Sequence, residues 1–403
     1  MERICLHNGV VYTGITKKSS SSVLIEDGQV ANVLSDRRFR QLPHADSYHV
    51  IDLQGLNVAP GLIDTHIHGI GGYGTEDLSG ESIQGMSRIL PSFGVTSFCP
   101  TIYPMSLQDM DRAIKAVVGE IGRECGASIL GIHMEGPFIS QEKLGVQRGE
   151  FVQPVDSSLL EHLWEVSEGN IISMTVAPEV KRMRELALNA AKKGILLQVG
   201  HSNASYEQMV EGIEAGILHA THFFNAMRSL HHRDPGVVGA ILIHPELSCE
   251  VIPDGRHLHP AIISFLIREK GTSKIVLVSD SLKPTAQKHP PFYANHEEVY
   301  LKDGVFYTVE DDTIAGSSLT LNQGVHFLTD LDISLQEALK MASLNPARTV
   351  RRDHICGSLL PGRRADLIVF DQSMHIYMTF VGGRLVHEQP LPSSPHSTLG
   401  AEP

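Results

Sequence analysis

The chain has 403 residues, of which 42% are hydrophobic and 20% are charged, and these proportions exclude an intrinsically disordered protein. The formal net charge of −13 leaves no general basic surface, which argues against nucleic acid or an anionic membrane as a partner. The length suits one large domain with a modest second module.

The cysteines and the N-terminal segment indicate a cellular compartment. The five cysteines are scattered, odd in number and without a CxxC pair, which is typical of a reducing environment rather than of a disulfide scaffold. The N-terminal segment lacks the apolar core of a signal peptide, and no stretch is long enough to span a bilayer. We therefore expect a soluble cytoplasmic protein.

The two ends of the chain have similar β-type patterns. Residues 1–60 contain short apolar runs and a hairpin signal at Asp27-Gly28, and residues 356–390 contain "ADLIVFD" and a second turn at Gly382-Gly383. The simplest arrangement pairs the two ends into one small β-sandwich domain. The last segment, 391–403, is rich in Pro and Ser and is expected to form a flexible tail.

Between the ends, residues 61–355 alternate strand, loop and helix, which predicts an α/β fold with a TIM-like (β/α)8 barrel. A helix is predicted over 106–124, with Ser106 as its N-cap, because apolar residues recur there at helical spacing. Further helices are predicted over 179–194, ending at Gly194, and over 334–350.

Side chains that can bind metal stand where short apolar runs end. The runs "LIDTHIHG", "ILGIHMEGP", "ILLQVGHS", "LHATHFFNA" and "KIVLVSDS" end in His66, His68, Glu135, His201, His222 and Asp280. The chemistry of a parallel barrel is assembled at the C-terminal ends of its strands, so these side chains are expected to converge. Together they predict a hydrolytic metal site.

The single positions also have simpler interpretations. His66 and His68 alternate along a strand, so one ion can bind both, but an isolated pair could equally begin a loop. Asp280 could be a helix N-cap, although a free carboxylate at the end of a buried strand favours a metal or proton-transfer role. His133 is interpreted as a residue of the barrel interior, and His222 is preferred over His219 as the ligand because it ends the run.

Glu135 could be a solvated strand-end residue, and His201 could simply close its strand. As a set, the nitrogen and oxygen ligands suit a divalent cation such as Zn²⁺, Fe²⁺, Mn²⁺ or Co²⁺. The absence of thiolates among them argues against a structural zinc cluster.

Several longer motifs resemble the amidohydrolase superfamily and, within it, the family of N-acetylglucosamine-6-phosphate deacetylases. "APGLIDTHIHG", "GIHMEGPF" and "GSLLPGRRADLIVFD" carry the wider resemblance, while "HFFNAM", "HHRDPG" and "DGRHLHP" carry the narrower one. The resemblance implies that Glu135, His201 and His222 hold the principal metal ion. His66 and His68 resemble members with a second ion, in which Glu135 bridges the two, and Asp280 would be the catalytic acid/base.

The same resemblance implies a sugar-phosphate site, made up of Val146, Asn225, Ala226, Arg233, His257, Ile314, Ala315 and Gly316. The planar guanidinium of Arg233 suits phosphate oxygens and His257 adds a donor, although a surface ion pair between Arg233 and Asp234 is the simpler interpretation of that arginine. In the family this arginine can reach the neighbouring subunit's site, which implies a homodimer.

Two departures from the family pattern are visible. Members often have a histidine where this chain reads Val146-Gln147, so the metal would have to polarise the amide more strongly here, which fits a two-ion site. After Asp280 the family's run of small residues is replaced by "SLKPTAQKHPPFYANHEE". The loop on the substrate side is therefore not defined by the resemblance.

The predicted function is hydrolysis of the N-acetyl amide of N-acetylglucosamine 6-phosphate to glucosamine 6-phosphate and acetate, in amino-sugar catabolism. A metal would activate water, and Asp280 would move its proton to the leaving amine. The alternatives are N-acetylgalactosamine 6-phosphate as substrate, another amidohydrolase such as a dihydroorotase or dipeptidase, and a non-catalytic sugar-phosphate sensor. Asp280 argues against the sensor, because binding alone needs no acid/base.

Overall fold

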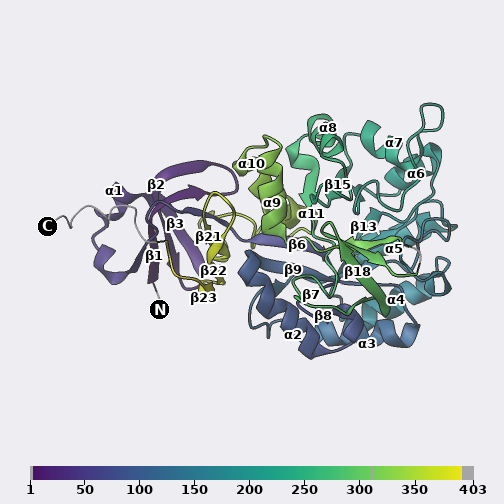
Figure 1. Cartoon of the computed structure of the whole chain (residues 1–403), viewed down its shortest axis with the longest axis horizontal. Coiled ribbons are helices and arrows are strands. Elements are labelled where there is room, and N and C mark those ends of the chain that lie inside the picture. The colour runs from purple at the N-terminus through teal and green to yellow at the C-terminus, as the bar shows by residue number, and fades with distance from the viewer. Residues whose placement is uncertain (1–2, 311, 393–403) are drawn as a thin grey trace.

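The structure, a computed structural model, describes residues 3–310 and 312–392 and has two lobes (Figure 1). The smaller lobe is built from strands of both chain ends, and the larger lobe holds the helices that surround a barrel. The tail expected over 391–403 lies, from residue 393 on, outside the described residues.

Eight parallel strands form the barrel, which confirms the predicted α/β fold of the TIM type. The ring closes between its first and last strands, since Ile67 bridges Ser281 in parallel and the Asp280 N–H donates to the His66 carbonyl at 2.9 Å. A short strand, β10 (Ser128–Ile129), also pairs with β9. In ring order the strands are β6 (Leu62–Ile67), β9 (Val95–Ile102), β11 (Ile132–Glu135), β12 (Ile171–Val176), β13 (Leu196–Val199), β14 (His219–Ala220), β15 (Ser248–Val251) and β16 (Ile275–Leu277).

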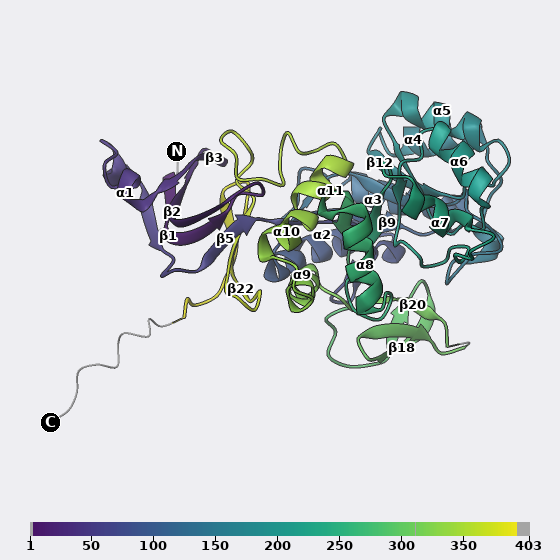
Figure 2. The same ribbon diagram turned by 90° about the horizontal axis from the view of Figure 1, so that it is seen from above.

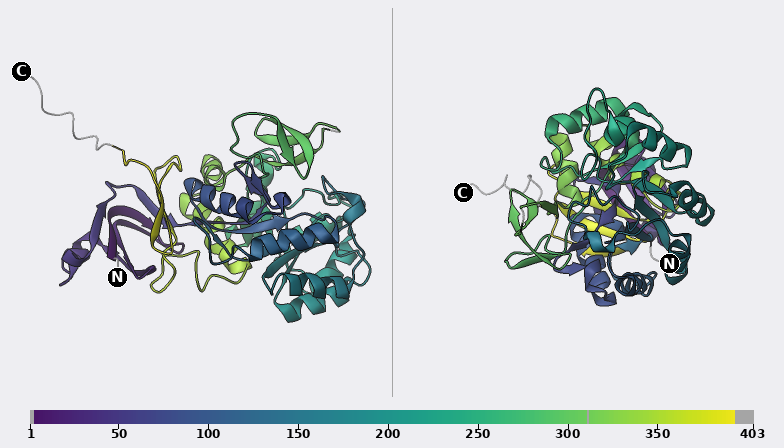
Figure 3. Two further views of the ribbon diagram at one scale, coloured as in Figure 1. Left: turned by 90° about the horizontal axis from the view of Figure 1, so that it is seen from below. Right: turned by 90° about the vertical axis from the view of Figure 1, so that its right-hand side faces the viewer.

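Helices surround these strands, as the end-on view in Figure 3 shows. Within 3–310 and 312–392, none is both long and apolar enough to cross a membrane. They are α2 (Gly80–Ile89), α3 (Leu107–Val118), α4 (Ser157–Val166), α5 (Met183–Lys193), α6 (Tyr206–Glu214), α7 (Gly236–Ile243), α8 (Pro260–Lys270), α9 (Leu321–Asp330), α10 (Leu335–Met341) and α11 (Leu344–Thr349), with 3₁₀ turns at η2 (Thr75–Asp77), η3 (Leu90–Phe93), η4 (Gly149–Phe151) and η5 (Thr272–Lys274).

Local signals located two of the three predicted helices. The Ser106 hydroxyl accepts from the Asp109 N–H at the start of α3, and Gly194 ends α5 with a φ of 75°. The single helix predicted over 334–350 is wrong, because the chain forms α10 and α11 with a break at Ala342-Ser343. Pro346 has no N–H, and in a continuous helix its ring would clash with the Ala342 carbonyl.

The smaller lobe is one eight-stranded sheet whose two halves pack their apolar faces together. Leu6 and Val23 from the N-terminal half share a buried core with Val369 and Phe380 from the C-terminal half. Both predicted hairpin turns are present, since Asp27-Gly28 and Gly382-Gly383 all have positive φ. The elements are β1 (Arg3–Tyr12), β2 (Lys17–Glu26), β3 (Gln29–Ser35), α1 (Asp36–Phe39), η1 (Ala45–Ser47), β4 (His49–Asp52), β5 (Asn57–Pro60), β21 (Leu367–Phe370), β22 (Ile376–Val381) and β23 (Arg384–Glu388).

This sandwich holds the first barrel strand in place. β5 belongs to the sandwich and continues through the single residue Gly61 into β6. Ile368 and Ile376 belong to the buried core of the barrel, and the Thr379 hydroxyl donates to the Pro91 carbonyl at 2.7 Å. Because β6 carries His66, the packing between the lobes fixes one side of the candidate site.

An insertion after the last barrel strand protrudes from the barrel (Figure 2). It is a four-stranded antiparallel sheet, and its last strand runs back toward the barrel mouth, where the Ser317 N–H donates to the Asp280 carbonyl at 3.1 Å. The strands of the insertion are β17 (Phe292–Ala294), β18 (Glu297–Lys302), β19 (Val305–Thr308) and β20 (Ile314–Ser317). The segment 281–298, which departs from the family pattern, leads into this sheet and ends at the start of β18. Two further short strands, β7 (Gly69–Ile70) and β8 (Tyr73–Gly74), follow β6.

Gly61 is a test of this junction. A Cβ on Gly61 would lie 2.1 Å from the side chain of Thr96 on β9, so Gly61→Ala must separate β6 from β9. We expect a destabilisation of about 1–3 kcal/mol, typical of overpacking, measured by urea denaturation followed by circular dichroism. Gly119→Ala is the matched control, since the nearest atom to its Cβ is 3.3 Å away. Equal stability of both variants would contradict this account of the junction.

Candidate metal centre and substrate cavity

The six predicted ligand residues all lie at the C-terminal end of the barrel. His66 lies on β6 with His68 just beyond it, and Glu135 is the last residue of β11. The other three, His201, His222 and Asp280, follow the ends of β13, β14 and β16. The loops reverse direction there, since His201 and Asp280 have φ values of 46° and 48°.

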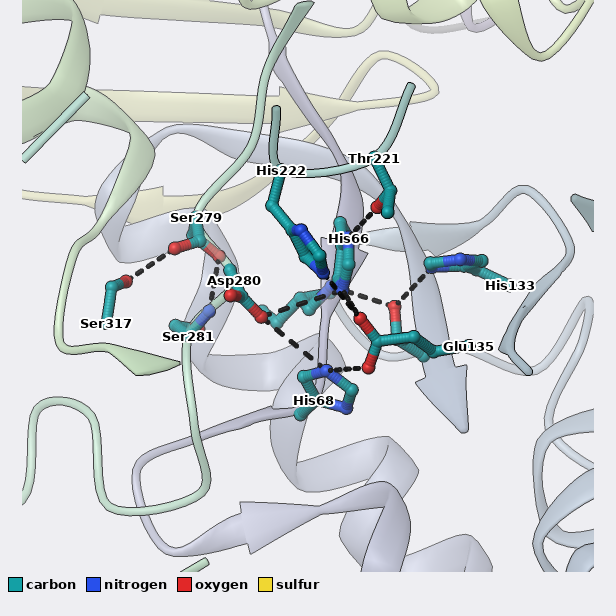
Figure 4. A network of polar contacts seen from close by, with 12 residues as sticks. His66, His68, His133, Glu135, Thr221, His222, Ser279, Asp280, Ser281 and Ser317 are labelled. Atoms are coloured by element: carbon teal, nitrogen blue, oxygen red, sulfur yellow. Dashed lines mark hydrogen bonds and ion pairs between the residues drawn. The ribbon is translucent and has the colours of Figure 1, made fainter. Parts of the chain in front are cut away.

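The carboxylate of Glu135 is at the centre of the cluster (Figure 4). Its Oε1 lies 3.3 Å from His66 Nε2, 3.2 Å from His201 Nε2 and 3.0 Å from His222 Nε2. Its Oε2 lies 3.2 Å from His68 Nε2. All five side chains are buried, so these groups face one another with little solvent between them.

Asp280 approaches the cluster from the side opposite Glu135 (Figure 4). Its Oδ1 lies 3.6 Å from His66 Nε2 and 3.5 Å from His68 Nε2. The ligand atoms therefore form two groups, one of His66, His68 and Asp280 and one of Glu135, His201 and His222, each with its atoms within 4.8 Å of one another.

The hydrogen bonds of two imidazoles indicate which nitrogen is free for a metal. His201 Nδ1 lies 3.0 Å from the Lys143 carbonyl, and His66 Nδ1 lies 3.1 Å from Glu250 Oε2. A carbonyl or carboxylate oxygen only accepts, so in both rings Nδ1 carries the hydrogen. In the neutral rings the Nε2 lone pairs then face the oxygens of Glu135. This arrangement is repulsive by itself and fits a cation between the groups.

The pKa shifts of His66 and Glu135 also favour a cation within the cluster. Burial by itself lowers the pKa of His66, but the charges of Glu135 and Asp280 outweigh it and raise the pKa well above its usual value. Burial raises the pKa of Glu135, but the charge of a protonated His66 and the hydrogen bonds that His201 and His222 donate when their Nε2 atoms are protonated hold the pKa well below its usual range. In the absence of a metal ion, protons on the rings thus take the place of the cation. The cluster thus attracts positive charge, and with nitrogen and oxygen donors alone it suits a divalent transition metal.

An open cavity of about 290 Å³ leads to this cluster. Seven of the eight predicted substrate residues line it, namely Val146, Asn225, Ala226, His257, Ile314, Ala315 and Gly316. The wall formed by Ile314 to Gly316 comes from β20, so the insertion completes the cavity. Asp254 holds the imidazole ring of His257 in place, since Asp254 Oδ2 lies 2.6 Å from His257 Nδ1.

Arg233 does not line this cavity. It is exposed, and its guanidinium lies 2.8 Å from His232 Nε2. The simpler interpretation, an ion pair with Asp234, is also not found, because Asp234 pairs with Arg228. No lysine or arginine lines the cavity among the described residues, so His257 is the only lining residue outside the ligand cluster that can carry a positive charge.

The charge of His257 is favoured by its surroundings. Burial lowers the pKa of His257, but the hydrogen bond and charge of Asp254 outweigh it and raise the pKa above its usual value. In turn, burial raises the pKa of Asp254, while His257 lowers it below its usual range. Asp254 therefore favours the protonated form of His257, which lines the cavity.

Several residues of the site were not among the predicted ones. Tyr103 stacks on His68 with ring centroids 3.8 Å apart, and Gln147 Nε2 donates to Glu135 Oε2 at 2.6 Å. Glu250 Oε2 lies 3.1 Å from Nδ1 of the ligand candidate His66. The sequence contained a signal for Glu250, because "SCEVI" places a charged residue inside an apolar strand. It contained no such signal for Tyr103, which follows an ordinary buried strand.

The two alternative histidines lie outside both ligand groups. His133 lies in the barrel interior, where its ring nitrogens contact the hydroxyls of Thr101 at 3.1 Å and Thr175 at 2.9 Å. His219 Nδ1 lies 2.7 Å from the Ser248 hydroxyl. Neither of them lines the cavity.

Comparison with known proteins gives this geometry a family. Residues 57–386 match the model of the amidohydrolase family. The chain is 34% identical over 348 residues to N-acetylglucosamine-6-phosphate deacetylase of Vibrio furnissii, and the match covers 86% of each chain. It is 31% identical over 330 residues to N-acetylgalactosamine-6-phosphate deacetylase of Escherichia coli O157:H7, and that match covers 81% of this chain and 87% of the relative. The crystal structure of N-acetylglucosamine-6-phosphate deacetylase from Pasteurella multocida superposes with a TM-score of 0.88 at 29% identity, covering 95% of this chain and 99% of the other.

The chain therefore belongs to the amidohydrolase family, and it is a hydrolase that acts on an amide. The cluster of histidines and carboxylates at the barrel mouth accords with the metal dependence of this family.

A divalent ion in the cluster should stabilise the fold. Adding Zn²⁺ or Co²⁺ to chelator-treated protein is expected to raise the free energy of unfolding by about 2.7 kcal/mol when the free ion is at 100 times its Kd. Thermal unfolding with increasing ion concentration measures this gain. In Glu135→Gln the gain should vanish, because the variant removes the carboxylate that four histidines face. A full gain in Glu135→Gln, equal to that of the exposed control Glu150→Gln, would contradict the assignment.

Proposed function

We propose that the protein hydrolyses the N-acetyl amide of N-acetylglucosamine 6-phosphate, releasing acetate and glucosamine 6-phosphate in amino-sugar catabolism. The observation that carries the proposal is the position of Asp280 and the Glu135 cluster at the base of a cavity in a chain whose relatives bear this activity in their names. N-acetylgalactosamine 6-phosphate is the second candidate substrate, because a relative at 31% identity is named for it.

We assign the residues of the chain the following roles. Glu135, His201 and His222 would hold one divalent ion, and His66 and His68 would hold a second. A bound ion supplies activation of water and polarisation of the acyl carbonyl. Asp280 accepts a proton from the attacking water and returns it to the departing amine, which would otherwise leave poorly. The walls from Asn225 and Ala226 and from Ile314 to Gly316 orient the sugar and limit water access.

The metal in this proposal is Zn²⁺, Fe²⁺, Mn²⁺ or Co²⁺, with one or two ions per subunit. Imidazole and carboxylate donors suit all four ions. The two ligand groups, which share the space between Glu135 and Asp280, support the two-ion form.

We further propose a cytoplasmic homodimer, in which Arg233 lies near the neighbouring subunit's cavity. The cavity has only His257 as a cation outside the ligand cluster among the described residues, while a phosphate favours a guanidinium partner. Arg233 is exposed and has no carboxylate partner among the described residues, so it is free to serve another subunit. The five cysteines are unpaired, which supports a reducing compartment.

Release of acetate tests the proposed reaction. Metal-loaded protein is expected to release acetate from N-acetylglucosamine 6-phosphate, and the kcat/KM for the galactosamine epimer shows which sugar is preferred. Asp280→Asn should lose about 10²–10⁴-fold in kcat, because the amide cannot accept the water proton. The same variant should keep the ion of the Glu135 group, as shown by metal analysis. Binding of both sugars without acetate release under any metal loading would favour a sensor instead.

The pH dependence of KM tests the phosphate role of His257. His257 is charged below its raised pKa, so KM for the phosphorylated substrate should rise as the pH increases through that pKa. Asp254→Asn removes the charge that raises the pKa, so the rise in KM should begin at lower pH. An unphosphorylated N-acetyl sugar is the control and should show no such rise. Identical pH profiles of KM for both sugars would rule out this role.

A further inference from the structure

Glu250 is a buried carboxylate that the proposed reaction does not use. It lies on β15, a barrel strand that carries none of the six predicted ligands and lies between β14 and β16, and only 1% of its surface is exposed. Among the described residues, its only ion-pair partners are His66, at 3.1 Å, and His219, at 3.8 Å. Burying a carboxylate without a lysine or arginine partner costs free energy of folding, so we expect Glu250 to have a functional role.

One oxygen of Glu250 joins the two halves of the candidate metal centre. Its Oε2 lies 3.1 Å from His66 Nδ1 and accepts from the Thr221 hydroxyl at 2.8 Å and, over 3.4 Å, from the His222 N–H. The Thr221 hydroxyl also lies 2.9 Å from His66 Nδ1, as Figure 4 shows. The other oxygen, Oε1, accepts from the Thr65 hydroxyl at 3.3 Å.

These contacts affect the two ligand groups differently. In the Glu135 group, His201 is oriented by the Lys143 carbonyl, and His222 meets Glu250 only through its backbone. In the other group, His66 Nδ1 contacts both Glu250 Oε2 and the Thr221 hydroxyl, and that hydroxyl donates to Glu250, so the carboxylate orients the ring directly and through Thr221. A carboxylate at Nδ1 makes the opposite ring nitrogen a better ligand and holds the ring in one orientation.

We propose that Glu250 is a positioning residue that makes the second ion site, formed with His66 and His68, able to hold its ion. This inference rests on the metal centre of the proposed function. Glu250 fixes the hydrogen on His66 Nδ1, so that Nε2 faces Glu135 and Asp280 with its lone pair. Its negative charge also offsets part of the charge that a second cation adds to a buried centre. The Glu135 group holds its ion without this help.

The test measures the affinity of each ion separately. Chelator-treated wild-type protein and Glu250→Gln are titrated with Co²⁺, followed by calorimetry and by the visible absorption of the bound ion, and the ions per subunit are counted by elemental analysis. Wild type should bind two ions. In Glu250→Gln the Kd of the second ion should rise about 10–100-fold, with the absorption of the second equivalent lost and the first Kd unchanged.

Two further variants separate positioning from a general loss of stability. Asp366→Asn is the matched control, since Asp366 is a buried carboxylate that pairs with Arg364 far from the ligands, and both of its ion affinities should stay as in wild type. Thr221→Val keeps the volume but removes the hydroxyl that links Glu250 Oε2 to His66 Nδ1. It should weaken the second ion by a smaller factor than Glu250→Gln, and it serves as the test should Glu250→Gln fail to fold.

Each remaining outcome overturns the proposal. Unchanged affinities in Glu250→Gln would remove its role, and equal weakening of both ions would make Glu250 a general structural residue. A wild-type protein that binds one ion, with the same Kd in Glu250→Gln, would also refute it. Acetate release by that one-ion protein would leave the proposed function intact, so the two failures can be told apart.

Discussion

The site depends on one buried carboxylate that faces four imidazoles. Glu135 lies within 3.3 Å of a ring nitrogen on each of His66, His68, His201 and His222. These five side chains are buried, so solvent screens their lone pairs and the charge of the carboxylate only weakly. A cation resolves the conflict, and the barrel supplies the ligand groups by bringing the ends of five strands to one place.

The rest of the fold acts to hold these strand ends in register. The sandwich anchors β6 through β5, and the backbone of Asp280 is tied on one side to β6 and on the other to the insertion strand β20. Asp280 sits at a positive φ, a conformation that these two flanking hydrogen bonds maintain. The acid/base candidate is thus set at a point where three parts of the chain meet.

The substrate side of the cavity is built from more scattered parts of the chain than the candidate metal centre is. Its walls come from loops after different strands and from the insertion, and its cation outside the ligand cluster is His257, held by Asp254. Arg233 lies outside the cavity. The motif around Arg233 was visible in the sequence, but where its guanidinium lies relative to the cavity depends on the path of an exposed loop.

The sequence by itself determined the class of fold, the ends of the strands and most of the residues around the cavity. Apolar periodicity and caps are local, so they located β6, α3 and the turn at Asp27-Gly28, and they failed over 334–350 only where Pro346 interrupts a helical pattern. The tertiary structure alone decided which atoms face each other. The contact of Glu250 with His66 and that of Gln147 with Glu135 join residues 184 and 12 positions apart, and no local pattern encodes such distances. They follow from strand order and tilt, because side chains from different strands meet only when the barrel closes.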